Sequence, residues 1–300
     1  MFARVSFARV SVWLSFMLAF DVSTLRSQES SMDVMTYNIR YLNQRDGDDV
    51  WGNRKQAVIE TIRNADVIGL QEVVAQQLDD IRSGTPNYDW YGVGRDDGEL
   101  HGEATPIGWR KSRFELLAKG TFWLSSTPSK VGSKGWDAAL PRIASWVRLR
   151  DSKSNSAFVF LNTHFDHRGK EARAQSAALI RKQSLELANG LPFIMTGDLN
   201  ARQGTRPLDN LLSNPKGDSG ASESGWTLFN ARDRTEAKDP GPNSTWNGFK
   251  KIEPGQRIDF VLVGPGVDVL RFETLNPKTE AGRFASDHMP LLAKVQAADD

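Results

Sequence analysis

The chain contains no cysteine in its 300 residues. This absence excludes disulfides, a thiol nucleophile and zinc held by cysteine. No G-x-S-x-G and no H-E-x-x-H segment occurs either, so the usual signals of serine hydrolases and zinc proteases are missing. The stretch "GVGRDDG" (92–98) does not fit a dinucleotide-binding loop, because its third glycine is misplaced. Any reactive site in this chain must therefore work without thiols and without these motifs.

Neither sign of charge is in excess. The chain has 38 basic and 37 acidic residues, and removal of residues 1–27 would leave 35 basic and 36 acidic ones. Tight nonspecific binding of nucleic acid depends on a basic excess that releases counterions, and this chain has none. A phosphate-bearing partner would have to be held by a few local cations. The content of 39% hydrophobic and 25% charged residues is ordinary for a globular protein with a core.

The N-terminal apolar run is too short to span a membrane comfortably. It covers the nine residues Val12 to Phe20, whereas a span needs about 20. Arg4 and Arg9 precede this run and small polar residues follow it, which is the pattern of an export signal. We expect residues 1–27 to be a signal peptide, and the protein to be secreted or periplasmic with no stable span after processing. An uncleaved anchor and a buried N-terminal helix are the alternatives.

Apolar periodicity predicts many strands and few helices in the rest of the chain. Strands are expected at 33–39, 66–70, 113–120, 145–150, 157–165, 192–200, 257–263 and 291–295, and helices at 54–65, 72–81 and about 169–188. The middle of the chain runs from strand to strand, unlike the regular alternation of a doubly wound parallel sheet. We therefore predict an α+β fold, a mixed or antiparallel sandwich flanked by helices. No long linker divides the chain after residue 28, so residues 28–300 are expected to form one domain, with 213–225 as a surface loop.

Polar residues recur where these predicted strands end or begin. They are Asn38, Gln71, Glu72, His164, Asp166, Asp198, Asn200, Asp259, Asp287 and His288. Each alone could be a cap or a turn, but strand ends at one edge of a sheet converge in space, so the set indicates a site. Asp198 and Asn200 are two residues apart and can address the same face. Asp259 lies between two apolar residues and needs a partner, for which His288 is the candidate.

The chemistry of this set is rich in oxygen. Carboxylates and side-chain amides without cysteine suit a hard cation such as Mg²⁺, with Mn²⁺ or Ca²⁺ as alternatives. Mg²⁺ keeps several waters and is commonly shared with a substrate phosphate, so few protein ligands suffice. The inventory therefore predicts metal-assisted hydrolysis of a phosphoester.

Six segments carry a resemblance to a known family. They are "MTYNIRY" (35–41), "IGLQEV" (68–73), "LNTHFDHRG" (161–169), "MTGDLN" (195–200), "RIDFVLV" (257–263) and "SDHMP" (286–290). In this order and spacing they resemble the endonuclease/exonuclease/phosphatase superfamily, the DNase I-like fold, over roughly residues 32–297. The stretches "GRDDGE", "GTFWLSSTP" and "GWDAALPRI" resemble a bacterial branch that is closer to nocturnin-type deadenylases than to phosphoinositide phosphatases.

The resemblance implies a four-layer αββα sandwich of two mixed, mostly antiparallel sheets, with a catalytic site at one rim. It implies Glu72 as the main Mg²⁺ ligand with Asn38 and Asp287 beside it, and His164 and Asn200 as ligands of the scissile phosphate. By the same resemblance, Asp198 orients or deprotonates the attacking water, and Asp259 holds His288 against a phosphate oxygen. His288 as the general base is the alternative.

The substrate class follows less directly from the sequence. We expect a phosphodiesterase acting on single-stranded nucleic acid, as an endonuclease or a 3′–5′ exonuclease, and a monomer. Arg95, Arg168 and Arg173 are predicted to bind substrate, with Arg110 as a further cation and Trp109 as a stacking surface for bases. A small-molecule, inositol or lipid phosphoester is the alternative substrate, and a binding module without activity is the alternative of another class.

Overall fold

The structure is a computed structural model that describes residues 30–212, 226–236 and 239–297. The predicted signal peptide, residues 1–27, and the predicted surface loop, residues 213–225, lie outside the described residues. The candidate active-site residues predicted from the sequence all lie inside them.

Two six-stranded sheets form the centre of the described part of the chain. The first sheet has the order β11 (Val267–Thr274), β12 (Leu291–Ala297), β1 (Met32–Asn38), β2 (Val67–Gln71), β4 (Ile107–Arg110) and β3 (Tyr88–Tyr91). The second sheet has the order β5 (Phe114–Trp123), β6 (Ile143–Asp151), β7 (Ala157–His164), β8 (Phe193–Asp198), β10 (Asp259–Val263) and β9 (Phe229–Asn230). Each sheet has one parallel pair, β1 with β2 and β7 with β8, and its other neighbours are antiparallel.

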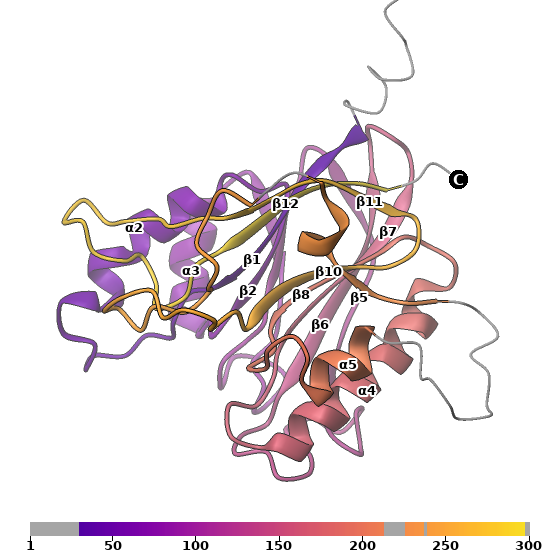
Figure 1. The fold of residues 1–300 in the computed structure, drawn as a ribbon, viewed down its shortest axis with the longest axis horizontal. Coiled ribbons are helices and arrows are strands. Elements are labelled where there is room, and N and C mark those ends of the chain that lie inside the picture. The colour runs from indigo at the N-terminus through magenta and orange to yellow at the C-terminus, as the bar shows by residue number, and fades with distance from the viewer. Residues whose placement is uncertain (1–29, 213–225, 237–238, 298–300) are drawn as a thin grey trace, which may run out of the picture.

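Helices cover the outer faces of both sheets. The α-helices are α2 (Trp51–Ile62), α3 (Ala75–Gly84), α4 (Lys170–Ala188) and α5 (Arg206–Leu212), and the short 3₁₀ helices are η1 (Gly47–Asp49) and η2 (Ala231–Arg234). Figure 1 shows α2 and α3 on one side of the molecule and α4 and α5 on the opposite side, with the sheets between them. The fold is therefore the predicted four-layer αββα sandwich.

Three apolar clusters hold these layers together. One lies between the sheets and contains residues such as Phe158, Phe160 and Val261. The second packs α4 and α5 on the second sheet, and the third packs α2 and α3 on the first sheet. Because both faces of the central strands are covered, every residue of β2 and β8 is buried, which is why these strands read as apolar runs rather than as alternating ones.

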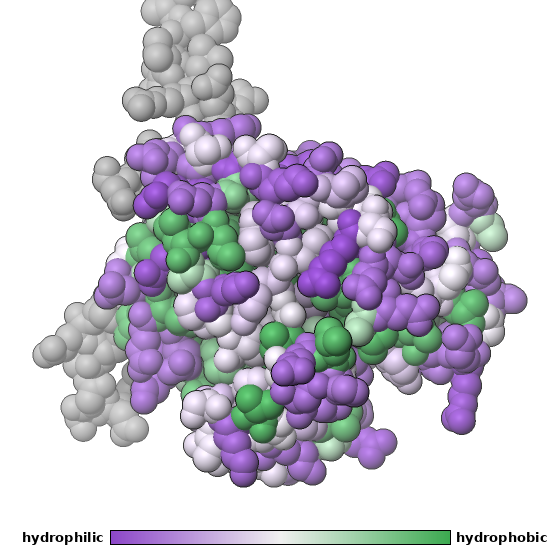
Figure 2. Space-filling view, turned by 180° about the vertical axis from the view of Figure 1, so that it is seen from behind, coloured by the Kyte–Doolittle hydropathy of each residue, from purple (hydrophilic) through white to green (hydrophobic). Residues whose placement is uncertain are grey.

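The exposed hydrophobic residues do not form one continuous surface on the face seen from behind. In Figure 2 the green residues of that face lie in several groups with purple hydrophilic residues between them. Among the described residues, no helix is both long enough and apolar enough to cross a membrane.

A buried polar network joins the two sheets close to one rim. Gln71 Nε2 donates to Asn162 Oδ1 at 2.7 Å and to Thr36 Oγ1 at 3.0 Å, and Thr196 Oγ1 donates to Asn162 Oδ1 at 3.1 Å. Gly69 makes room for this network, because a Cβ there would lie 2.2 Å from Thr196 Oγ1 and 2.5 Å from Asn162 Cγ. The close approach brings the ends of the two parallel strand pairs together, which is where the polar residues lie.

Candidate active site

Strand register brings the predicted polar residues to one edge. Asn38 pairs with Gln71 at the end of the parallel strands of the first sheet. In the second sheet Asp198 lies between His164 on β7 and Asp259 on β10. Asn38 Nδ2 donates to Asp198 Oδ2 at 3.0 Å and so connects the two sheets at this edge.

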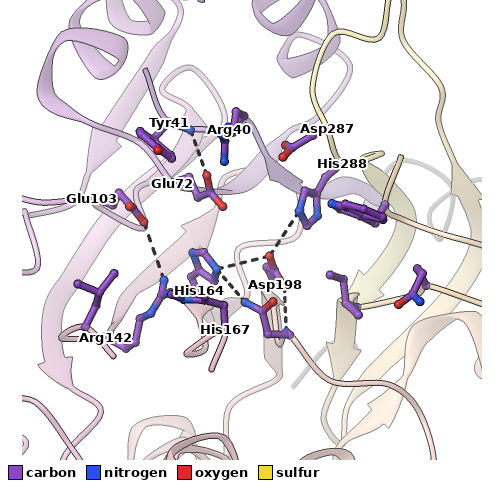
Figure 3. Close-up of a pocket in the computed structure, with 15 residues that line it drawn as sticks. Arg40, Tyr41, Glu72, Glu103, Arg142, His164, His167, Asp198, Asp287 and His288 are labelled. Atoms are coloured by element: carbon purple, nitrogen blue, oxygen red, sulfur yellow. Dashed lines mark hydrogen bonds and ion pairs between the residues drawn. The ribbon is translucent and has the colours of Figure 1, made fainter. Parts of the chain in front are cut away.

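A pocket of about 710 Å³ opens at this edge. It is lined by Arg40, Tyr41, Glu72, Glu103, Leu140, Arg142, His164, His167, Asp198, Asn200, Trp246, Gln256, Ile258, Asp287 and His288. In Figure 3, His164 and Asp198 lie in the middle, Glu103 and Arg142 lie on one side, and His288 lies on the other. Six of the eight core residues predicted from the sequence line the pocket. Asn38 and Asp259 are buried behind the wall and contact residues that line it.

Glu72 is held in a defined orientation at the end of β2. Its Oε1 accepts a hydrogen bond from Asn38 Nδ2 at 3.1 Å, and its Oε2 accepts one from the Tyr41 backbone N–H at 3.1 Å. Glu72 has a φ of 62°, and its neighbours Arg40 and Asn200 have φ angles of 58° and 45°. Non-glycine residues rarely adopt this left-handed conformation, and residues that do so gather at functional sites. The backbone is thus shaped to present these side chains.

Asp259 and His288 form the buried pair expected from the sequence. His288 Nδ1 lies 2.9 Å from Asp259 Oδ2, and His288 Nε2 lies 3.8 Å from Asp198 Oδ2. Burial alone would lower the pKa of His288, but the carboxylates of Asp259 and Asp198 outweigh it and hold that pKa well above its ordinary value. Burial raises the pKa of Asp198 to about 7, and the charge of Asp259 adds to the rise. The imidazole is therefore charged near neutral pH, and Asp198 can exchange a proton there.

His164 and Asn200 form a second, uncharged pair. Asn200 Nδ2 lies 3.0 Å from His164 Nε2 and donates also to the Phe165 carbonyl oxygen at 3.1 Å. Burial, followed by the positive charge of Arg142, holds the pKa of His164 well below its ordinary value. A neutral imidazole can accept the amide hydrogen, so burial and hydrogen bonding agree on the protonation state. Both amide hydrogens of Asn200 are thereby engaged, so an anion bound here would replace one of these hydrogen bonds.

The donor set of the pocket fits a hard divalent cation. Burial raises the pKa of Asp287, and the negative charge of Glu72 adds to the rise although His288 opposes it. A cation between two carboxylates would offset the repulsion between their negative charges. Oxygen donors of this kind are the ligands that Mg²⁺ prefers. Glu72 also offers an oxygen within 4.8 Å of the ligand atoms of His164 and Asp198. Asp287, a predicted ligand, belongs to neither compact group of ligand atoms in the described residues.

Several residues of the pocket were not predicted from the sequence. They are Arg40, Tyr41, Leu140, Arg142, His167, Trp246, Gln256 and Ile258. Glu103, which also lines the pocket, lies at the end of the acid-rich stretch 94–103. Arg40 and Tyr41 follow Asn38 after one residue, inside the segment 35–41 that carries the resemblance, and this position was an available signal. No sequence pattern set Arg142 apart from the other arginines.

The three arginines predicted to bind substrate lie elsewhere. Arg95 is buried behind Glu103 and donates to it at 2.6 Å and 3.1 Å. Arg168 is exposed, Arg173 donates to the Asp166 carbonyl oxygen, and neither lines the pocket. Arg110 pairs with Asp66 at 3.1 Å, also away from the pocket.

The expectation that Trp109 stacks on bases was wrong. Trp109 is 3% exposed and packs in the cluster between the sheets. The short strand β4 buries this side chain because its neighbours β2 and β3 place it against the core. Its ring is therefore closed to any ligand.

Comparisons with known proteins agree with this geometry. An endonuclease/exonuclease/phosphatase from Bacteroides vulgatus has a TM-score of 0.81 and is 36% identical, over 89% of this chain and 99% of that one. A mannosyl-6-phosphatase of Bacteroides thetaiotaomicron has a TM-score of 0.78 and is 36% identical, over 88% of this chain and 99% of that one. The human nocturnin catalytic domain with bound sulfate has a TM-score of 0.65 at 18% identity, over 90% and 94% of the two chains, which shows likeness of fold alone. A comparison with curated proteins gave no match.

The family model assigns most of the chain. The model described as the Endonuclease/Exonuclease/phosphatase family matches residues 35–288, a range that includes all eight residues predicted for the catalytic and metal-binding core. The chain belongs to the endonuclease/exonuclease/phosphatase family, whose members hydrolyse phosphoester bonds.

Proposed function

We propose that this protein is a divalent-metal-dependent phosphatase that acts on small phosphorylated carbohydrates. The observation that carries the proposal is one pocket of about 710 Å³ in which paired carboxylates, a charged histidine and a neutral histidine–amide pair face the same space. The substrate class is supported by the 36% identity to a mannosyl-6-phosphatase over 88% of this chain.

Glu72 and Asp287 are the proposed ligands of Mg²⁺, with Mn²⁺ or Ca²⁺ as alternatives, and Asn38 orients Glu72. When bound, such a cation neutralises phosphate charge and polarises a phosphoryl oxygen. The Asn200 amide and the His164 imidazole are proposed to bind the other phosphate oxygens, the amide by exchanging its hydrogen bond to His164 Nε2 and the imidazole by then carrying its hydrogen on Nε2. His288, kept charged by Asp259, is proposed to donate from Nε2 to an oxygen that gains charge in the transition state.

Asp198 is the proposed general base. A water oxygen attacks phosphorus, its proton passes to the Asp198 carboxylate, and the bond between phosphorus and the sugar oxygen breaks. The leaving oxygen takes up a proton from solvent water and departs as the alcohol, and Asp198 later releases its proton to solvent. A general base works best when its pKa is near the working pH, and the pKa of Asp198 is about 7. His288 suits the base role less, since its pKa is raised and the ring is already protonated.

A nuclease is the second candidate function, and one observation favours it. Trp246 lines the pocket and is 36% exposed, so its ring is open to stacking. Stacking of a base on an aromatic ring contributes ~1–3 kcal/mol and favours single strands. The loss of Trp109, Arg110, Arg168 and Arg173 from the set of binding residues weakens this candidate relative to a small substrate.

A substrate panel tests the proposal. The chain from residue 28, produced on the proposal that residues 1–27 direct export, is assayed with Mg²⁺. The substrates are hexose 6-phosphates, p-nitrophenyl phosphate, a phosphoinositide, and single- and double-stranded oligonucleotides. We expect phosphate release from hexose 6-phosphates with a kcat/KM at least ~10-fold above that for any oligonucleotide bond. The reverse order would move the assignment to a nuclease.

A further inference from the structure

One wall of the pocket is built from a carboxylate that is locked in place. Glu103 precedes Ala104, which forms an isolated antiparallel bridge with Val73 and so sets Glu103 close to Glu72. Arg95 donates to both carboxylate oxygens of Glu103, at 2.6 Å and 3.1 Å. The Glu103 side chain remains 19% exposed toward the pocket that it lines. Its position is therefore fixed from behind while one side stays open.

A guanidinium with unmet donors lies next to this carboxylate. The Arg142 side chain is 5% exposed, and within the described part of the chain its Nε and Nη1 have no hydrogen-bond partner. Two carboxylates lie within ion-pair distance, Asp166 Oδ2 at 3.5 Å from Nε and Glu103 Oε2 at 3.9 Å from Nη1, and Nη2 lies 3.1 Å from His167 Nδ1. Leaving N–H groups buried and unpaired is unfavourable, and because Nε and Nη1 are closed to solvent, a ligand accepts from them once the Arg142 side chain turns toward the pocket that it lines.

The two walls of the pocket differ in character. Glu103 and Arg142 lie on one side of Glu72 and His164 in Figure 3, while His288 lies on the other. Trp246 pairs with His288 through an isolated bridge, so the aromatic ring belongs to the His288 side. A group bound at the phosphate-binding residues would thus have an ionic wall on one side and an aromatic ring on the other.

We infer that Glu103 and Arg142 form a subsite that binds hydroxyl groups of the substrate's alcohol portion. The inference rests on the proposed function and names the residues that choose among phosphate esters. A hydroxyl can donate to the Glu103 carboxylate and accept from Arg142, and two neighbouring hydroxyls can bridge both side chains. A second phosphate would meet the negative charge of Glu103, and an apolar alcohol would offer no hydrogen bond to either side chain. A polyol therefore offers hydrogen bonds to both Glu103 and Arg142, whereas an anionic or apolar group does not.

The subsite is tested with substrates that differ only in hydroxyls. Wild-type protein, Glu103→Gln and Arg142→Gln are assayed with Mg²⁺ on glucose 6-phosphate, 2-deoxyglucose 6-phosphate, mannose 6-phosphate and p-nitrophenyl phosphate. In each variant the ratio of kcat/KM for a hexose phosphate to that for p-nitrophenyl phosphate should fall at least ~10-fold, the scale for one hydrogen bond to a charged group. Removal of a contacted hydroxyl from the substrate should lower kcat/KM by a smaller factor in the variants than in the wild-type protein.

A matched ion pair serves as the control. Glu115 and Arg150 lie 3.0 Å apart on β5 and β6, with side chains 64% and 44% exposed, and neither lines the pocket. Glu115→Gln and Arg150→Gln should leave the ratio within about twofold of wild type, as expected for an exposed pair. Melting temperatures show whether each variant is folded, and if Arg142→Gln does not fold, Glu103→Gln alone decides.

The possible outcomes separate the two proposals. An equal loss of kcat/KM for hexose phosphate and for p-nitrophenyl phosphate in folded Glu103→Gln would leave their ratio unchanged. With a wild-type protein that is a hexose-phosphatase, this result overturns the subsite and leaves the proposed function standing. A wild-type protein that releases no phosphate from any monoester and cleaves oligonucleotides overturns both.

Discussion

Nδ1 of His288 lies 2.9 Å from Oδ2 of Asp259, in a pair that is buried between β10 and the loop before β12. The carboxylate keeps the imidazole charged in a place where burial alone would neutralise it. Two residues that are 29 positions apart in the chain thus act as one charged unit next to Asp198.

Replacing Asp259 should uncouple this unit. Asp259→Asn removes the negative charge, so the pKa of His288 should fall and the neutral ring should no longer donate from Nε2 with a positive charge. We expect kcat to fall by ~10²–10³, the scale for loss of one positioned electrostatic group. The pKa of His288 can be followed by NMR of the ring protons, since the chain has only four histidines.

Non-additive losses of activity in a double variant distinguish a positioning role of Asp259 from a general disturbance of the structure. If Asp259 acts through His288, the double variant with His288→Gln should lose little more activity than His288→Gln alone. Losses that multiply in the double variant would show that the two side chains act independently.

Arg54 should prove to be a structural clamp for the loops of the active site. This arginine is 1% exposed, and its guanidinium donates to the backbone carbonyl oxygens of Ile39, Asp49 (2.8 Å), Arg40 (2.8 Å) and Ala285 (3.3 Å). Arg54→Lys keeps the charge but cannot reach these acceptors as a fork. We expect the free energy of unfolding to fall by ~2–4 kcal/mol, since several buried carbonyl groups lose their partner.

Urea unfolding measures the effect of Arg54→Lys, and the adjacent lysine offers a control. Lys55 pairs with Asp80 at 3.4 Å with its side chain 45% exposed. Lys55→Ala should change the free energy of unfolding by less than ~1 kcal/mol, as is common for surface pairs. Equal losses in both variants would argue against a special role of Arg54.

Removal of metal should affect stability as well as activity. A cation that binds only the folded protein raises the melting temperature with its concentration. We expect Mg²⁺ to raise the melting temperature of the EDTA-treated protein, and EDTA to abolish phosphate release until Mg²⁺ is restored. Glu72→Gln should remove most of the thermal shift, because one carboxylate ligand is lost.

The control for the metal prediction is an acid on a neighbouring helix. Glu60 lies on α2 and accepts from Gln56 Nε2 at 2.8 Å in an exposed pair. Glu60→Gln should keep the full Mg²⁺ shift. A shift of equal size in Glu72→Gln would place the cation elsewhere in the protein.

The sequence was informative about features that depend on neighbouring residues in the chain, such as where an apolar strand ends. The ends of apolar strands are visible in a sequence, so polar residues that the structure brings to one edge could be predicted, while the resemblance implied their roles; the family resemblance and fold were confirmed. Side-chain direction at a turn is set by tertiary packing. The sequence therefore did not show that Arg142 reaches the pocket while Arg168, in the same segment 161–169 as His164, is exposed to solvent.

Short or irregular elements were missed for a related reason. β4 has four residues and β11 contains a register shift between Val269 and Arg271, so neither shows a sustained period of two. Trp109 on β4 therefore looked like an available ring, although two neighbouring strands bury it. Periodicity identifies long elements covered on both faces better than short ones whose burial depends on their neighbours.

Asp166 should contribute less to stability at acid pH than at neutral pH. Burial alone would raise the pKa of Asp166, but hydrogen bonds from backbone N–H groups, among them those of Gly169 and Arg168, together with the charge of Arg142, lower it to about 2. The folded pKa is thus below the ordinary value of 3.8, so the ionised carboxylate stabilises the protein above pH 3.8 and this contribution is lost as the pH falls toward 2.

Asp166→Asn should lower the free energy of unfolding at pH 7, by roughly 1–3 kcal/mol for the weakened hydrogen bonds. The difference from wild type should shrink as the pH falls from 4 to 3, because the unfolded wild-type chain then takes up a proton on Asp166 while the folded carboxylate stays ionised, which stabilises the unfolded state. Urea unfolding of both proteins at several pH values measures this, with Glu115→Gln as an exposed control that should differ little from wild type throughout. A difference that stays constant down to pH 3 would mean that Asp166 contributes through its shape and hydrogen bonds and not through its charge.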